Sequence, residues 1–126
     1  MKRFLILCFC LIASCGVAFA QQQMVDIVAM RDNFIVAGIA ARKCNATDPN
    51  REDVHDRNFT IISRKAMEVI IAREPGADPE EVRKKDLAHI EELQDAAFNL
   101  IRTEGCKSEK VRALLRMHKI HESMRF

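Results

Sequence analysis

The chain contains no tryptophan and no tyrosine, and it has only four glycines and three prolines in 126 residues. Without these two aromatic residues it lacks the usual side chains on which proteins stack nucleic-acid bases. It has no glycine-rich phosphate-binding loop, no Gly-x-Ser-x-Gly motif and no Cys-x-x-Cys motif. These motifs are typical of nucleotide binding, serine hydrolysis and dithiol redox chemistry, respectively. We therefore expect a protein that is not an enzyme.

The mostly apolar run near the N-terminus is too short to span a membrane by itself. The mostly apolar run at residues 4–15 covers 12 residues, whereas a transmembrane helix needs about 17–25. Lys2 and Arg3 precede this run, and Ala18-Phe19-Ala20 follows it with a small-x-small cleavage pattern. This order is typical of a secretory signal peptide. The sequence predicts a cleaved signal at 1–20 and one exported domain at 21–126, in the periplasm or outside the cell.

A second interpretation of the same segment is a lipoprotein signal. Ile12-Ala13-Ser14-Cys15 fits a lipobox, in which Cys15 would become the lipidated N-terminus. The protein would then be anchored to a membrane surface by its acyl chains. Both interpretations predict export, but they differ in whether the protein is free or anchored.

Removal of the leader leaves little net charge and few cysteines. Without Lys2 and Arg3 the 20 basic residues fall to 18, which equals the 18 acidic residues. This balance argues against a nucleic-acid partner, because nucleic-acid-binding domains usually carry a basic excess. The five cysteines fall to two, Cys44 and Cys106. In an exported protein, such a pair predicts one disulfide.

Helical spacing of apolar residues dominates the exported part. Helices are predicted at about 23–43, 49–73, 79–104 and 108–124, because apolar residues recur there every three to four positions. Start signals are expected at Asp48-Pro49, Asp78-Pro79 and Ser108. Four helices with short connections favour an all-α, up-down-up-down four-helix bundle. In that arrangement helices 1 and 3 end side by side, which brings Cys44 and Cys106 together.

The histidines are the sharpest candidates for a binding site. His118 and His121 lie one helical turn apart, and His89 lies one turn before Glu92. Imidazole and carboxylate groups could bind zinc or copper. His89, Glu92, His118 and His121 are thus tentative metal ligands. The alternative is that His118 belongs to the apolar stripe and that His121 supplies a favourable partial charge at a helix C-terminus.

A second cofactor interpretation involves methionine. In the expected bundle, the end of helix 4 lies beside the start of helix 1, where Met24 and Met30 occur. This arrangement resembles soluble periplasmic b-type cytochromes, which are four-helix bundles that hold haem non-covalently. The resemblance implies an axial Met from early in helix 1 and an axial His near the C-terminus. Met24 or Met30 and His121 would then be haem ligands, although the cysteine pair departs from that family.

The last helix also suggests a surface role. The segment 107–126 contains six basic residues and two acidic ones. A basic amphipathic helix can contact an anionic membrane or an acidic partner, or it can pair with acidic faces of the same protein. The methionines and other apolar residues also leave room for a homodimer interface. Asn45 and Asn58 begin formal glycosylation sequons, which matter only in a eukaryotic secretory pathway.

Taken together, these features predict a small exported interaction protein that binds another macromolecule. It looks broadly like small periplasmic helical proteins with one disulfide, which include acid-stress chaperones, inhibitors and toxin-neutralising immunity proteins. A protein partner is expected, and the alternative function is a haem or metal carrier that uses the C-terminal histidines.

Overall fold

The structure, a computed structural model, describes residues 26–126, and this part of the chain is helical with no strand. It contains four helices: α1 (Ile27–Lys43), α2 (Glu52–Arg73), α3 (Pro79–Glu104) and α4 (Glu109–Ser123). The expected all-helical class is confirmed. The expected signal peptide, Cys15 and Met24 lie outside the described residues.

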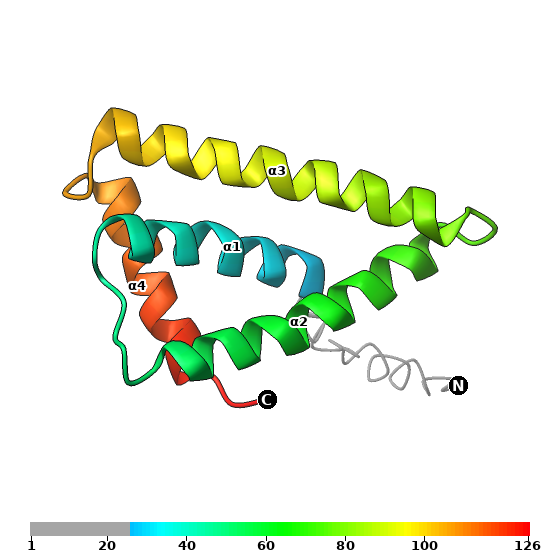
Figure 1. Cartoon of the computed structure of the whole chain (residues 1–126), viewed down its shortest axis with the longest axis horizontal. Helices are drawn as coiled ribbons and strands as arrows, with labels where there is room; N and C mark the ends of the chain where they lie inside the picture. Colours follow the sequence, from blue (N-terminus) through cyan, green and yellow to red (C-terminus); the bar gives the residue numbers. More distant parts are fainter. Residues whose placement is uncertain (1–25) are drawn as a thin grey trace, which may run out of the picture.

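The first three helices alternate in direction, but the fourth crosses them. Figure 1 shows α2 and α3 diverging from the turn that joins them, with α1 between them. It also shows α4 crossing the end of the molecule where α1 and α3 finish. The up-down-up-down arrangement is therefore not confirmed. Gly105 ends α3 with a φ of 77°, a conformation that favours glycine, and α4 packs more extensively on α1 than on α3.

Three of the four helices begin directly after a residue whose side chain caps the helix N-terminus. The side chains of Asp26, Asp78 and Ser108 accept backbone N–H bonds at the starts of α1, α3 and α4. The expected start at Asp48-Pro49 is wrong, because α2 begins at Glu52. Asp48 Oδ1 instead accepts a bond from the backbone N–H of Asn50, 2.9 Å away, within a turn before the helix. An Asp-Pro pair is equally suited to a turn.

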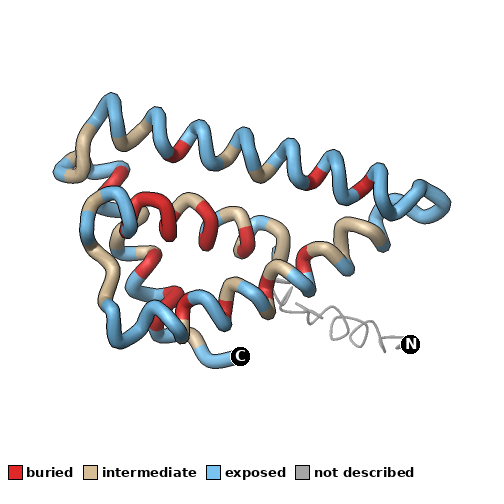
Figure 2. Tube along the Cα trace, in the orientation of Figure 1, coloured by how far each residue is buried: buried red, intermediate tan, exposed pale blue. Residues whose placement is uncertain are grey.

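The first helix forms the centre of the fold. Figure 2 shows that α1 is the most buried helix and that α3 is exposed along most of its length. Small residues in the second half of α1 let its neighbours approach, and the core cluster contains Ile35, Ile39 and Ala97. The buried residues of α1 are Arg31, Phe34, Ile35, Ala37, Gly38, Ile39, Ala40 and Ala41.

The expected disulfide is present. Cys44 follows the last residue of α1, and Cys106 lies in the turn between α3 and α4. Their Cα atoms are 5.7 Å apart, which is a normal separation for a disulfide. The bond therefore ties the start of α4 to the end of α1.

Candidate functional site

Three histidines come together where α1, α2 and α4 meet. His55 lies in the first turn of α2, and His118 and His121 lie in the second half of α4. Each of these residues is at most 4% exposed. Their rings gather beside Phe34 of α1. We call His55, His118 and His121 the histidine cluster.

Ring stacking holds the cluster together. The ring of His121 lies parallel to that of Phe34, with centroids 3.7 Å apart and an interplanar angle of 6°. The ring of His55 is tilted against Phe34 at 5.3 Å and against His118 at 4.4 Å. Aromatic carbon thus takes the place of water beside the ring of His121, which favours its neutral form.

The hydrogen bonding of the cluster is incomplete. Within residues 26–126, His55 Nε2, His118 Nδ1 and His121 Nδ1 are buried and have no hydrogen-bond partner. His118 Nε2 lies 3.2 Å from Glu122 Oε1, within ion-pair distance but without hydrogen-bond geometry. Unpartnered buried polar atoms destabilise a fold. Three such atoms lie together in the cluster, and hydrophobic packing alone does not explain polar atoms at these positions.

The surroundings keep two of the histidines neutral. Burial is the main reason that the pKa of His121 falls to about 4, and the charges of His55 and His118 act in the same direction. Burial also lowers the pKa of His118; the charges of His55 and Arg42 add to this effect, and Glu122 opposes it. Both rings are therefore uncharged at neutral pH. His121 therefore carries no full positive charge at the end of α4 at neutral pH.

One asparagine fixes the far end of α4. Asn58 Nδ2 donates hydrogen bonds to the backbone oxygens of His121 and Met124, at 3.1 and 3.0 Å. Asn58 is 2% exposed, so its sequon is inaccessible in the folded protein. Together with the stacked rings, these two bonds dock the C-terminal half of α4 onto α2.

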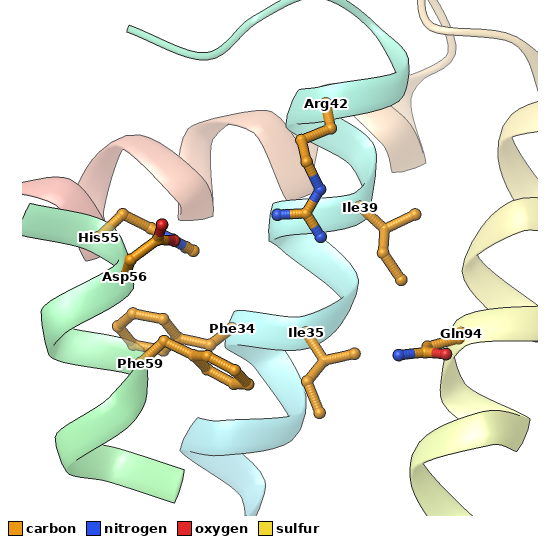
Figure 3. Close-up of a pocket in the computed structure, with 8 residues that line it drawn as sticks. All are labelled: Phe34, Ile35, Ile39, Arg42, His55, Asp56, Phe59 and Gln94. Atoms are coloured by element: carbon orange, nitrogen blue, oxygen red, sulfur yellow. The ribbon is translucent and has the colours of Figure 1, made fainter. Parts of the chain in front are cut away.

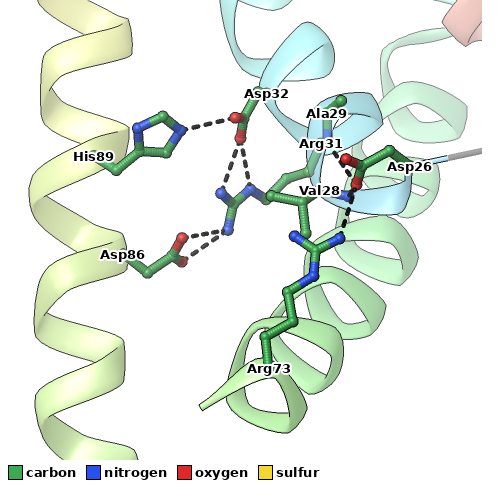
Figure 4. Close-up of polar contacts among 8 residues, drawn as sticks. All are labelled: Asp26, Val28, Ala29, Arg31, Asp32, Arg73, Asp86 and His89. Carbon is green, nitrogen blue, oxygen red and sulfur yellow. Dashed lines mark hydrogen bonds and ion pairs between the residues drawn. The ribbon is translucent and has the colours of Figure 1, made fainter.

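A second buried polar group links α1 to α3 (Figure 4). Arg31 Nη1 donates to both carboxylate oxygens of Asp86, at 2.8 and 2.7 Å, and Arg31 Nη2 donates to Asp32 Oδ1 at 2.8 Å. Burial alone would lower the pKa of Arg31, but the bonds and charges of Asp32 and Asp86 raise it instead. His89 Nε2 lies 2.8 Å from Asp32 Oδ2. This network compensates a buried charge that would destabilise the fold if it were left without its partners.

The structure does not gather the tentative metal ligands into one group. His118 and His121 belong to the histidine cluster, His89 pairs with Asp32, and Glu92 is exposed on α3. Among the residues that the structure describes, no three His, Cys, Asp or Glu side chains are placed to hold a metal ion. The metal site stays a prediction.

The haem interpretation also stays a prediction. Met24 lies outside the described residues, and Met30 lies in the first half of α1, four residues before Phe34. The ring of His121 is stacked on Phe34 itself. In this conformation a planar cofactor at that face of His121 would have to displace Phe34.

Sequence reasoning missed His55, Arg31 and Asp86. A signal for His55 was present, because it precedes Phe59 by four residues and so extends the apolar stripe of α2 by one turn. Arg31 precedes Ile35 by the same interval on the buried face of α1. A charged residue on an apolar stripe indicates either that the buried face of the helix is assigned wrongly or that the charge has a buried partner. Arg31 has such a partner in Asp86.

Several basic side chains of α4 are paired within the protein. Lys110 Nζ lies 2.6 Å from Glu104 Oε1, and Arg112 and Arg116 both contact the carboxylate of Glu109, at 2.7 and 3.0 Å. These pairs use part of the positive charge that the sequence offers for a membrane or an acidic partner.

No protein-family model matches this chain, and neither a curated protein nor a solved structure is significantly similar to it. Within residues 26–126, no helix combines the length and apolar character that crossing a membrane requires. The candidate site therefore has to be interpreted from its own chemistry.

Proposed function

We propose that this protein is an exported, non-enzymatic binding protein that holds apolar segments of other proteins, as a stress chaperone does, and that acid uncovers its binding surface. The observation that carries the proposal is the histidine cluster between α4 and the rest of the fold. The disulfide and the lack of a membrane-crossing helix in the described residues are compatible with export.

The two ends of α4 are held by different chemistry. Cys106 precedes α4 and is covalently joined to Cys44 at the end of α1, and protonation does not affect that bond. The far end is held by the ring of His121, which stacks on Phe34, by the ring of His118, which packs against His55, and by Asn58. Loss of the far-end contacts would let α4 move while its start stays attached.

Of the disulfide and the histidine cluster, only the cluster responds to acid. The charged groups that face the cluster are Arg42 from α1, Asp56 from α2 and Glu122 from α4. From α3, the neighbouring side chain in the adjacent pocket is Gln94, which does not titrate. Protonated rings would lie beside one another and near Arg42, with little water to solvate them. Opening of the cluster relieves this repulsion, so protonation favours release of α4.

Release of α4 would uncover Phe34, which is 1% exposed in the closed form. Acid also loosens the packing of other exported proteins and exposes their apolar surface. The binding surface and its targets would therefore become available under the same conditions. This coincidence favours a chaperone over an inhibitor or an immunity-type protein.

The test is suppression of aggregation, measured by light scattering of an acid-sensitive client at neutral pH and at about pH 4–5. We expect the disulfide-intact protein to suppress aggregation in acid and to be inactive at neutral pH. His121→Phe, which keeps the aromatic stacking but cannot be protonated, should weaken suppression in acid. Equal activity at both pH values, or none at either, would contradict the proposal.

A further inference from the structure

A small pocket opens between α1, α2 and α3, next to the histidine cluster (Figure 3). Its volume is about 110 Å³, which is smaller than the engineered cavity of about 150 Å³ that accepts benzene in another protein. It has room for a short aliphatic group but not for a drug-sized ligand. The lining residues are Phe34, Ile35, Ile39, Arg42, His55, Asp56, Phe59 and Gln94.

The lining divides into an apolar floor and a polar rim. Phe34, Ile35 and Ile39 of α1 and Phe59 of α2 form the floor. The guanidinium of Arg42 lies beside Ile39 in Figure 3, and the side chains of His55 and Asp56 approach the same space from α2. The rim thus offers one cation from α1 and one anion from α2 beside an apolar hollow.

The polar groups of the rim are largely unused. Within the described part of the chain, Arg42 makes no ion pair, and Asp56 contacts only the ring of His55, at 3.5 Å. His55 is only 4% exposed, and its buried Nε2 atom has no hydrogen-bond partner. Arg42 and Asp56 also do not pair with each other. Their charges remain available to a ligand.

A glycine brings two of these groups close to the backbone of α1. A Cβ atom at Gly38 would lie 3.4 Å from both Arg42 Nη1 and His55 Cε1. Glycine inside a helix destabilises it by roughly 1 kcal/mol relative to alanine, so its presence usually has a packing or functional reason. At Gly38 a Cβ would touch both rim groups at about van der Waals distance, so the glycine leaves room beside them.

We propose that this pocket binds a free α-amino acid with a short aliphatic side chain. The carboxylate would accept hydrogen bonds from the Arg42 guanidinium, whose planar fork matches a carboxylate. The ammonium group would donate to the Asp56 carboxylate, and the side chain would enter the floor between Ile35 and Phe59. A simple fatty acid would satisfy Arg42 but would bring its negative charge near Asp56. An amino acid satisfies both rim charges.

The experiment compares four probes in calorimetric titrations of the disulfide-intact protein. L-Leucine carries all three recognition elements, 4-methylpentanoate lacks the ammonium group, isopentylamine lacks the carboxylate, and glycine lacks the side chain. Methyl NMR signals of Ile35 and Ile39 report whether a probe enters the pocket. Because the chain has no tryptophan or tyrosine, intrinsic fluorescence cannot serve as the readout.

We expect L-leucine to bind more tightly than the other three probes and to shift the signals of Ile35 and Ile39. Arg42→Gln and Asp56→Asn should each raise its Kd roughly tenfold or more, the usual result of losing a charge-assisted bond. Arg116→Gln, at an exposed arginine of α4, should leave the Kd unchanged. No binding of L-leucine, or equal binding of 4-methylpentanoate or isopentylamine, would overturn the proposal.

The pocket proposal is independent of acid release. Binding of L-leucine is measured at neutral pH in the closed form, whereas suppression of aggregation is measured in acid. Failure of either result therefore leaves the other unaffected.

Discussion

The ring of His121 lies face to face on the ring of Phe34, with their centroids 3.7 Å apart. The two rings are in direct face-to-face contact, yet one of them can be protonated. Its Nδ1 atom is buried without a partner among the described residues. A phenylalanine would fill this space without that unpaired nitrogen. The histidine therefore makes the α1–α4 contact sensitive to acid.

The first prediction concerns the pH dependence of stability. The pKa of His121 is about 4 in the folded protein, whereas an unperturbed histidine has a pKa near 6.5. As the pH falls below about 6.5, the unfolded chain binds the proton before the folded chain does, so stability decreases until about pH 4. The loss from His121 should reach about 3 kcal/mol, and His118, whose pKa is also lowered, should add to it. Urea unfolding from pH 7 to pH 4 measures this loss.

The second prediction assigns that pH dependence to one ring. His121→Phe should remove about 3 kcal/mol of the acid-induced loss while leaving neutral-pH stability nearly unchanged, since the replaced ring is uncharged there. His89→Phe is the matched control, because His89 is 46% exposed and lies outside the cluster. The paired unfolding curves decide the outcome. An equal acid-induced loss in His121→Phe and wild type would contradict the assignment.

The sequence predicted the helices better than their packing. Asp78, Ser108 and the apolar stripes gave the number of helices and most of their bounds because capping and periodicity are local properties. The Cys44–Cys106 bond also followed, since it needs only the ends of α1 and α3 to meet. The crossing of α4 did not follow. It depends on how α4 packs against α1, and a single stripe does not specify a crossing angle.

The candidate site was predicted only in part. His118 and His121 attracted attention because they lie one turn apart in the sequence, but their partners His55 and Phe34 come from other helices. The sequence suggested Met30 and His89 as partners instead, on the assumption that all helices run side by side. Burial of a polar residue depends on tertiary packing, which periodicity alone does not give.

The third prediction concerns the buried pair of Arg31 and Asp86. Asp86→Leu leaves the Arg31 guanidinium, which is 2% exposed, without its main counter-charge. It should therefore destabilise the fold by about 3–5 kcal/mol. The double variant Arg31→Met/Asp86→Leu should recover much of that loss, because the buried charge is gone. Urea midpoints of the three proteins test this, and a double variant less stable than Asp86→Leu would contradict it.

The fourth prediction concerns the disulfide. Cys44 and Cys106 are 62 residues apart in sequence, and the chain-entropy model gives about 4 kcal/mol for a loop of that size. Cys44→Ser/Cys106→Ser should lower the free energy of unfolding by about that amount, and thermal unfolding with and without reductant should show the same difference in wild type. A reductant-induced shift in the double variant would indicate an effect unrelated to this bond.

The last prediction concerns the docking of α4 by Asn58. Asn58→Ala removes the donor to the backbone oxygens of His121 and Met124, which should destabilise the protein by about 1–3 kcal/mol. Because Cys106 still holds the start of α4, the loss should be local. Hydrogen exchange should rise in the second half of α4 and stay unchanged near the disulfide. Asn99→Ala, at an exposed asparagine of α3, is the matched control and should change neither. Uniformly faster exchange across all four helices would mean that Asn58 supports the whole fold, and that α4 does not open as a separate unit.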